Sequence, residues 1–412
     1  MQPRLNRLWL GLMAMVFGFA MLYLWYIIFP GKVSPEAFQY FSLEQINQGR
    51  EHSRIQQLLM LAVVILEVIL LGWFIWSGKA IALTRWTQQI TRGSYYGSAL
   101  LYFLGLWLIF RILYFPFSYL NGFFLQKKWG FSTQTFSAWW VDTLKNAGLE
   151  LVLGILGVLL FFCILKHWPR AWWLVVASLL SIWLVAQNFI WPLVVSPMFN
   201  RFEPVKDPAV LSMVSELSTK AGIPVDEVLV MDASRRTTRA NAYFAGMGQT
   251  KQIVLYDTLL EDYPPDQVKA VLAHEMAHWQ QGHILKGVTL GIFSNFIVWG
   301  LLFIFLRTTL APLTRYPPHT WALTLLFFAA VSFIASPIQS SISRGMEREA
   351  DRVSVQLTGD IPAAIRLQVN LVAKNSSDVS PPAFIEWFSY SHPSVLNRIH
   401  LLQQEKAADL GI

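Results

Sequence analysis

Two histidines and a glutamate stand at a spacing that could bind and use a metal ion. The segment Val271–His278 reads Val-Leu-Ala-His-Glu-Met-Ala-His and contains the pattern His-Glu-x-x-His. On a helix, His274 and His278 project from one face, where both imidazoles can bind one metal. Glu275 lies about 100° round the helix, close enough to take a proton from a water on the metal. The flanking apolar residues suit a buried helix, so the spacing predicts a catalytic zinc site.

The third protein ligand that a catalytic zinc requires must come from elsewhere. His283 follows His274 at a distance of about 180° on a continuous helix, so it is expected just outside the ligand set, at an interface, or without a role. Farther along, Glu347 and Asp351 share one face of a predicted helix. Taken alone, such a helix is typical of a solvated surface. We expect Glu347 to bind the metal and Asp351 to orient His274 through its other ring nitrogen.

The composition predicts a membrane protein. Of the 412 residues, 54% are hydrophobic and 14% are charged, whereas in soluble domains about a quarter of the residues are charged. The net charge of +7 comes from scattered Lys and Arg without a basic run, so a lipid bilayer is an expected partner and nucleic acid is not.

The single cysteine, Cys163, lies in an apolar run and excludes both a cysteine zinc site and an intramolecular disulfide. Seven runs are long enough to span a bilayer as helices: Leu8–Phe29, Leu58–Trp76, Leu100–Pro116, Leu149–Leu165, Ala171–Val195, Gly287–Leu306 and Trp321–Pro337.

The order of these spans divides the chain. The first is a signal anchor, because it is too long for a cleaved signal peptide and no small-residue cleavage site follows. We expect a five-helix membrane region at 1–195, a catalytic α+β segment at 196–283, two transmembrane helices at 284–338 and a helical segment supplying the third ligand at 339–412. Since two spans separate the catalytic segment from the tail, both face the same side of the membrane. Within the catalytic segment, the predicted helices are Pro208–Ala221 and Asp266–Gln281, and the predicted strands are Val225–Met231, Ala240–Gly246 and Gln252–Tyr256.

Polar residues interrupt the amino-terminal spans. Glu67 lies in the middle of the second span, Arg111 late in the third, and Gln187 and Asn188 in the fifth. Ionisable groups at such depth usually face a bundle interior or water. Arg111 could equally extend its side chain to the membrane surface.

Several ordered motifs resemble the CAAX prenyl protease type 1 family of membrane gluzincin endopeptidases. The resemblance covers most of the chain. The motifs are Pro116–Ser118, Gly130-Phe131 through Gln134-Thr135, Ser196–Pro204, Arg239–Phe244, Ile253–Leu260, His274–His278 with Trp279 and Gly282-His283, Ser343-Arg344 with Glu347 and Ala350-Asp351, and Ser391–Ser394 with Arg398.

The resemblance implies a mainly α integral membrane protein. About seven transmembrane helices would enclose a chamber, with a small α+β zincin-like catalytic domain. It implies one zinc ion per chain with Glu347 as the third ligand. It also implies that His392 is catalytic and that Arg398 lies near the substrate carbonyl or the metal. Without the resemblance, His392-Pro393 would indicate a turn.

The resemblance further implies how substrate binds. Asn241 would line the cleft, and the strand through Ala242 and Tyr243 would be the edge along which a peptide adds as a further strand. Such pairing uses main-chain hydrogen bonds and depends little on side chains.

The predicted function is zinc-dependent endoproteolysis of a peptide or membrane protein, prenylated or not, similar to removal of carboxy-terminal CAAX tripeptides. One alternative is a quality-control protease that clears misfolded or stalled membrane proteins without recognising a lipid. Another is a non-proteolytic scaffold or transporter, although a closed structural zinc site has no use for Glu275. The resemblance places the site on the cytosolic side, while Lys and Arg in the short loops are nearly balanced. The last residues carry no dilysine-type retrieval signal, so a bacterial inner membrane is favoured over the endoplasmic reticulum.

Overall fold

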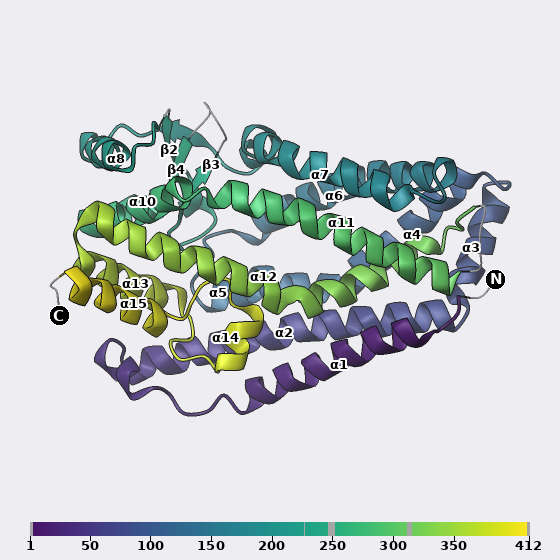
Figure 1. The fold of residues 1–412 in the computed structure, drawn as a ribbon, viewed down its shortest axis with the longest axis horizontal. Helices are drawn as coiled ribbons and strands as arrows, with labels where there is room; N and C mark the ends of the chain where they lie inside the picture. Colours follow the sequence, from purple (N-terminus) through teal and green to yellow (C-terminus); the bar gives the residue numbers. More distant parts are fainter. Residues whose placement is uncertain (1–2, 226, 246–251, 311–314, 410–412) are drawn as a thin grey trace.

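The computed structural model describes residues 3–225, 227–245, 252–310 and 315–409. Seven of the described helices are long and apolar enough to cross a membrane, and each corresponds to one predicted span. They run along the long axis of the molecule (Figure 1). These helices are α1 (Arg7–Ile28), α2 (Leu43–Trp76), α4 (Tyr95–Tyr119), α6 (Phe136–His167), α7 (Trp172–Ile190), α11 (His283–Thr309) and α12 (Thr320–Thr358).

Capping residues explain where several of these helices begin. The side chain of Asn6 accepts hydrogen bonds from the amides of Leu8 and Trp9 at the start of α1. Ser42 and Gln45 form a capping box, so α2 starts well before its apolar part. Hydropathy locates only the apolar part of such a helix, which is why the predicted second span is shorter than α2.

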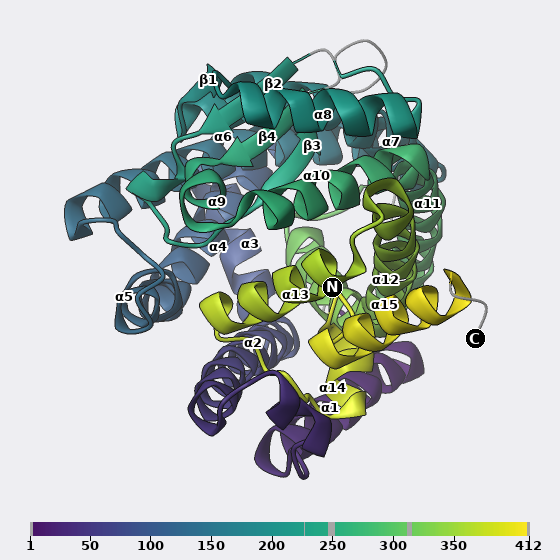
Figure 2. The same ribbon diagram turned by 90° about the vertical axis from the view of Figure 1, so that its left-hand side faces the viewer.

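The membrane helices close into a ring. The contacting pairs are α2–α4, α4–α6, α6–α7, α7–α11, α11–α12 and α12–α2, and α1 packs outside against α2 and α12 (Figure 2). In the most apolar 18-residue stretch of each of these helices, only 11–44% is buried within the protein. A large part of every helix is therefore left to face lipid or the interior of the ring. The predicted fold class, mainly α with seven helices around a chamber and a small α+β domain, is confirmed.

The polar residues predicted in the spans face cavities. Glu67 lines a cavity of about 290 Å³ together with Arg111 and Glu150. Arg111 Nη1 is 3.0 Å from Glu150 Oε2, so its side chain pairs inside the bundle rather than reaching for the membrane surface. Gln187 and Asn188 line a second cavity, of about 400 Å³, between α7 and the start of α11.

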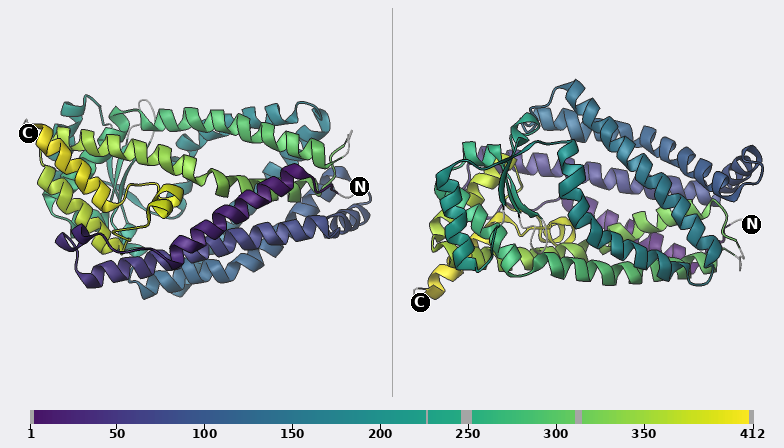
Figure 3. Two further views of the ribbon diagram at one scale, coloured as in Figure 1. Left: turned by 60° about the horizontal axis from the view of Figure 1, so that its bottom comes forward. Right: turned by 90° about the horizontal axis from the view of Figure 1, so that it is seen from above.

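A small α+β domain lies at one end of the bundle, opposite the amino terminus (Figures 1 and 3). Its sheet has the order β1 (Phe202–Pro204), β2 (Glu227–Met231), β4 (Gln252–Tyr256) and β3 (Ala242–Ala245). Strands β2 and β4 are parallel, whereas β1–β2 and β3–β4 are antiparallel. The predicted strands are present, although Gly246 lies outside the described residues. The three-residue β1 was not predicted because it is too short to show alternation.

Helices cover the sheet and complete this end of the molecule. The predicted helices appear as α8 (Pro208–Ala221) and α10 (Pro265–Gln280). On α10, Val268, Leu272 and Met276 are buried in the core against the sheet, and each such side chain stabilises the packing by about 1.5–3 kcal/mol. The other helices are η1 (Pro35–Gln39), α3 (Lys79–Ile90), η2 (Leu120–Phe124), α5 (Leu125–Lys128), η3 (Trp191–Val195), η4 (Ser196–Met198), η5 (Ala233–Arg235), α9 (Asp257–Asp262), α13 (Ile361–Asn375), α14 (Ala383–Ser389) and α15 (Val395–Asp409).

Helix α12 connects the membrane bundle to the domain without a break. It continues through Pro337 to Thr358 and crosses the boundary expected at 338/339. Beyond the apolar part, Arg344 donates to the main-chain carbonyls of Glu386 (2.7 Å) and Tyr390 (2.6 Å), which fixes the end of α14 against α12. The same rigid helix thus spans the membrane and extends along α10.

Candidate active site

The packing of α10 against α12 brings together the three residues expected to bind a metal. His274 Nε2 and His278 Nε2 lie 3.2 Å apart. Glu347 Oε2 lies 3.3 Å from His274 Nε2, and Glu347 Oε1 lies 3.5 Å from His278 Nε2. The two histidines lie on successive turns of α10, and Glu347 reaches them from the carboxy-terminal half of α12.

The donor atoms of these three residues are spaced to fit a zinc ion. With zinc–ligand bonds of about 2.0–2.2 Å and tetrahedral angles, neighbouring donor atoms lie roughly 3.3–3.5 Å apart. The separations of 3.2, 3.3 and 3.5 Å have this size, the last two being to different oxygens of the Glu347 carboxylate. With one donor atom from each residue, all three atoms lie within 4.8 Å of one another. Glu347 is 7% exposed, and its Oε2 makes no hydrogen bond to the described residues. Arg398 Nη2 lies 3.9 Å from this oxygen, beyond hydrogen-bond distance, so a bound metal ion would neutralise the carboxylate more directly.

A buried carboxylate and a guanidinium support the first histidine. His274 Nδ1 lies 3.1 Å from Asp351 Oδ1. Asp351 is 2% exposed and accepts from Arg398, whose Nε lies 2.7 Å from Oδ2 and whose Nη2 bonds Oδ1. Asp351 and Arg398 therefore lie just behind His274, where they hold its ring with Nε2 directed at the other donors.

His283 lies just outside the three expected ligands, which is one of the places expected for it, although the helix geometry behind that expectation differs. Extrapolation of a continuous helix placed His283 away from the site, but α10 ends at Gln280 and Gly282 adopts φ +65°. This turn brings His283 Nδ1 to 2.9 Å from His278 Nδ1. The other ring nitrogen of His283 lies 3.0 Å from Glu349 Oε2. His283 and Glu349 thus stand behind His278 much as Asp351 and Arg398 stand behind His274.

Glu275 lines a pocket of about 120 Å³ beside His274. Burial raises the pKa of its carboxyl to about 7, and the nearby Glu347 carboxylate adds to this. His274 and Arg398 oppose the shift because positive charge favours the carboxylate. A carboxyl group with a pKa near neutrality is suited to accept and return a proton.

His392 faces the same opening from the loop before α15. Its Nε2 lies 3.4 Å from Glu347 Oε1, and its Nδ1 lies 2.9 Å from Ser391 Oγ. The side chain is 58% exposed, in contrast to the buried Arg398. His392 is therefore accessible to a molecule bound in the cleft.

The strand β3 forms the outer edge of the sheet. The amide of Tyr256 donates to the carbonyl of Asn241 at 3.0 Å, so the main-chain groups of Asn241 point towards β4. Because main-chain groups alternate in direction along a strand, those of Ala242 and Phe244 point away from the sheet. Asn241 and Ala242 line the pocket of Glu275, whereas Tyr243 lines the 400 Å³ cavity towards α7 and α11.

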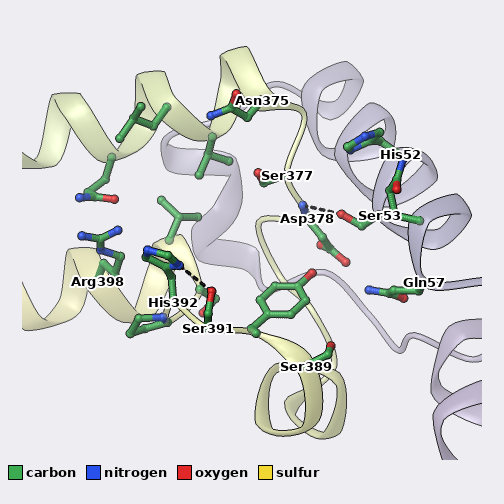
Figure 4. A pocket seen from close by; sticks show the side chains of 18 of the residues that line it. His52, Ser53, Gln57, Asn375, Ser377, Asp378, Ser389, Ser391, His392 and Arg398 are labelled. Atoms are coloured by element: carbon green, nitrogen blue, oxygen red, sulfur yellow. Dashed lines mark hydrogen bonds between the residues drawn. The ribbon is translucent and has the colours of Figure 1, made fainter. Parts of the chain in front are cut away.

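A polar recess of about 560 Å³ adjoins the pocket of Glu275. Figure 4 shows His392 and Arg398 on one side of it and His52, Ser53 and Gln57 of α2 on the other. The recess and the pocket share the lining residues Ala240, Asn241, Gln368, Leu371, His392 and Arg398. The cleft therefore extends from His274 and Glu275 to the polar start of α2.

Sequence reasoning missed two contributors to this cleft. The polar part of α2 has His52, Ser53, Gln56 and Gln57 on one helical face, and this i, i+4 pattern before a span was a usable signal. Helix α13 contributes Leu367, Gln368 and Leu371. Its start was marked by Asp360, which caps the amide of Ala363, and by Pro362.

Comparisons with known proteins agree with this geometry. Residues 204–406 match the model of peptidase family M48, and residues 30–201 match that of the CAAX prenyl protease N-terminal region, described as five membrane helices. The uncharacterized metalloprotease YhfN of Bacillus subtilis (strain 168) is 27% identical over 414 residues, which cover 97% of this chain and 96% of that protein. CAAX prenyl protease 1 of Saccharomyces cerevisiae is 31% identical over 309 residues, covering 70% of this chain and 68% of that protein. The crystal structure of S. mikatae Ste24p has the same fold, with a TM-score of 0.84 at 24% identity over 98% of this chain and 100% of that chain.

Proposed function

This chain belongs to peptidase family M48, among the CAAX prenyl proteases, and from that premise we propose that it is a zinc enzyme that cleaves peptides bound along β3. It is a multi-pass membrane metallopeptidase that acts on a peptide or protein substrate. The observation that carries the proposal is the cluster of donor atoms from His274, His278 and Glu347, which all lie within 4.8 Å of one another. The same family membership argues against a non-proteolytic scaffold or transporter.

The proposed metal ligands are His274, His278 and Glu347, with one zinc ion per chain. When bound, zinc supplies a Lewis acid that polarises the scissile carbonyl and lowers the pKa of a water molecule. Asp351 Oδ1 lies 3.1 Å from His274 Nδ1, and this pairing would keep the Nε2 lone pair directed at the metal position. Arg398 compensates the charge of Asp351, which is otherwise buried without a cation.

Glu275 and His392 carry the proton transfer and the charge stabilisation. Glu275 accepts the proton of the attacking water and returns it to the leaving amine, a role that suits its raised pKa. His392 is exposed to the cleft and donates to the carbonyl oxygen of the substrate as negative charge develops there.

The substrate pairs with the free main-chain groups of Ala242 and Phe244. β3 is the edge strand, so an extended peptide can add to it without displacing any described strand. Asn241 lies at the start of this edge, between the pocket of Glu275 and the polar recess. Recognition through main-chain groups tolerates many side chains, so the substrate range depends on what fits the two ends of the cleft.

Two substrate classes are consistent with this cleft. The names of the curated relatives in yeast and plants, CAAX prenyl protease 1 and its homologues, support prenylated carboxy-terminal peptides as substrates. Main-chain recognition at an open edge supports the second candidate, clearance of misfolded or stalled membrane proteins without a lipid requirement. The first is our main proposal.

The lipid bilayer surrounds the seven helices in this proposal, with the active site on the cytosolic side. The amino terminus lies at the opposite end of the bundle from the site, and would then face outside (Figure 1). The full-length similarity to a Bacillus protein supports a bacterial inner membrane over the endoplasmic reticulum.

The experiment offers purified protein three substrates: a farnesylated CAAX peptide, its unprenylated twin and an unfolded membrane protein. Glu275→Gln, which keeps the shape but cannot accept a proton, is the control for contaminating proteases. Preference for the farnesylated peptide supports the main proposal. If the unprenylated peptide and the unfolded protein are cleaved as well as the farnesylated peptide, the result supports quality control. If none of the three is cleaved in a zinc-dependent manner, both substrate proposals are contradicted.

A further inference from the structure

A loop of the amino-terminal membrane half lies against the chain that leads into the substrate strand. It comprises residues 130–135, between α5 and α6, and is called the 130–135 loop here. It contains Gly130-Phe131 and Gln134-Thr135, a motif to which the proposed chemistry assigns no role. Ser132 forms an isolated antiparallel bridge with Thr237, four residues before Asn241.

The contact is a dense set of hydrogen bonds between the loop and residues 234–238. Both main chains and three threonine hydroxyls take part, so the two segments are held in a defined register. The bonds run from the Thr133 amide to Arg236 O (3.2 Å), the Thr238 amide to Phe131 O (3.2 Å), Thr133 Oγ1 to Ser234 O (2.7 Å), Thr237 Oγ1 to Phe131 O (3.0 Å) and Thr238 Oγ1 to Gly130 O (2.9 Å).

Two arginines of the catalytic segment extend into the membrane half. Arg236 Nε lies 2.9 Å from Asp142 Oδ2 at the start of α6, and its Nη2 lies 3.4 Å from Asp142 Oδ1. Gln134 of the loop donates to the same carboxylate at 2.6 Å. The guanidinium of Arg239 stacks 4.2 Å from the ring centre of Phe131, which is 4% exposed.

These contacts hold the chain that enters the substrate strand, in addition to its contacts with β4 and the residues directly after β4. On the β4 side, Thr258 Oγ1 donates to the carbonyl of Arg239 and the Tyr256 amide donates to that of Asn241. In addition, Arg236 and Arg239 are fixed by the membrane half. Only Ala240 separates this anchored segment from Asn241 and the free edge of β3. A shift of the 130–135 loop would therefore be transmitted directly to the groups that pair with substrate.

We propose that Phe131, Asp142, Arg236 and Arg239 are positioning residues that set the substrate strand at its binding position. They touch neither the metal ligands nor Glu275. The membrane half would thus control how tightly substrate binds while leaving the chemical step alone. This inference rests on the proposed function, because it requires that substrate pairs with β3.

A different result is expected if Arg236 and Asp142 have only a structural role. The pair of Arg236 and Asp142 is partly exposed, with side chains 24% and 15% accessible. Partly exposed ion pairs add little to overall stability. If the pair only fastened two parts of the protein, its loss would lower stability slightly and leave the Michaelis constant unchanged.

The test measures kcat, KM, bound zinc and thermal unfolding in detergent for Arg236→Met, Asp142→Asn and the double variant. Misalignment of one main-chain hydrogen bond to substrate should raise KM about tenfold, with kcat changed by less than about twofold. The double variant should resemble Arg236→Met rather than the sum of the two singles, because both remove the contact between Arg236 and Asp142 and only Arg236→Met also removes the hydrogen bond to Asn200 Oδ1. Arg236→Lys keeps the charge and should recover part of the loss.

Arg235→Met is the matched control. Arg235 is adjacent in sequence, is 55% exposed and pairs with Asp232 rather than with the membrane half. It should leave KM unchanged. Unchanged KM in Arg236→Met and Asp142→Asn would overturn the proposal, as would loss of zinc or of kcat in place of a KM effect.

A variant of the strand itself separates this inference from the function on which it rests. Ala242→Pro removes an outward amide of β3 and is measured in the same assay. If Ala242→Pro raises KM and Arg236→Met does not, the positioning role fails and the substrate edge stands. If neither raises KM, the substrate edge itself is wrong, and the positioning role falls with it.

Discussion

The carboxylate behind His274 offers a sharp test of the proposed zinc site. In Asp351→Asn the side chain keeps its size, so no cavity forms, but an amide cannot accept from both neighbours as the carboxylate does. Its nitrogen must face donors either at the Oδ1 position, where His274 Nδ1 lies 3.1 Å away and Arg398 Nη2 bonds, or at the Oδ2 position, where Arg398 Nε lies 2.7 Å away. At least one of these hydrogen bonds is therefore replaced by a contact between two donors.

Two consequences of Asp351→Asn follow from the burial of this group. Loss of the carboxylate behind a metal-binding histidine typically weakens metal binding 10–100-fold, which corresponds to about 1.4–2.7 kcal/mol. Arg398 is 9% exposed and would keep its charge without its partner. Removing one partner of a buried ion pair costs about 3–5 kcal/mol of folding stability. The uncompensated guanidinium also repels a dication, so both effects weaken zinc binding.

The assay measures the zinc dissociation constant of Asp351→Asn by competition with a chelator, together with thermal unfolding of the metal-free protein in detergent. The double variant Asp351→Asn with Arg398→Met should recover much of the folding stability, because the unpaired cation is gone. Its zinc affinity should stay below that of the unmodified protein, since His274 remains unsupported. Asp266→Asn, on the same helix as His274, is the matched control: it breaks the partly exposed pair between Asp266 and Arg366 of α13, which is worth at most about 1 kcal/mol. Zinc affinity in Asp351→Asn equal to that of the unmodified protein would refute the reasoning.

Three further variants test the remaining assignments. Glu275→Gln should lower cleavage at least about a hundredfold with zinc stoichiometry unchanged, measured by peptide turnover and elemental analysis; loss of zinc would instead make Glu275 a ligand. Glu347→Ala should purify largely without metal and inactive, whereas Glu349→Ala should retain zinc with at most a modest loss of affinity, because it reaches His278 only through His283; metal-replete Glu347→Ala would contradict the ligand assignment. Ala242→Pro should weaken peptide binding while zinc content and thermal stability stay close to those of the unmodified protein, as isothermal titration with a peptide inhibitor would show; unaltered binding would exclude β3 as the substrate edge.

Local patterns in the sequence were sufficient for much of the fold. Apolar runs identified all seven membrane helices, because the bilayer sets the length of such helices whatever they pack against. The boundaries of α8 matched residue for residue, since Asp207 caps its start and Gly222 ends it in a left-handed conformation. The polar start of α2 escaped notice because hydropathy locates only the apolar part of a helix, and β1 escaped notice because three residues are too few to show alternation.

The sequence by itself determined the chemistry that this protein can perform. The spacing of His274, Glu275 and His278 depends on a single helix, and helical geometry is the same in any fold. It therefore predicted two adjacent imidazoles with a carboxylate beside them, and their ring nitrogens lie 3.2 Å apart in the structure.

Only the tertiary structure decided what stands around these residues. Glu347 comes within 3.3 Å of His274 because α12 packs along α10, a contact between segments far apart in the chain. His283 returns to the site because Gly282 reverses the direction in which a continuous helix would have carried it. The recess wall from α2 and the anchoring of Arg236 by Asp142 likewise join distant segments. Such contacts depend on how whole elements pack, and no local periodicity encodes the relative placement of two elements.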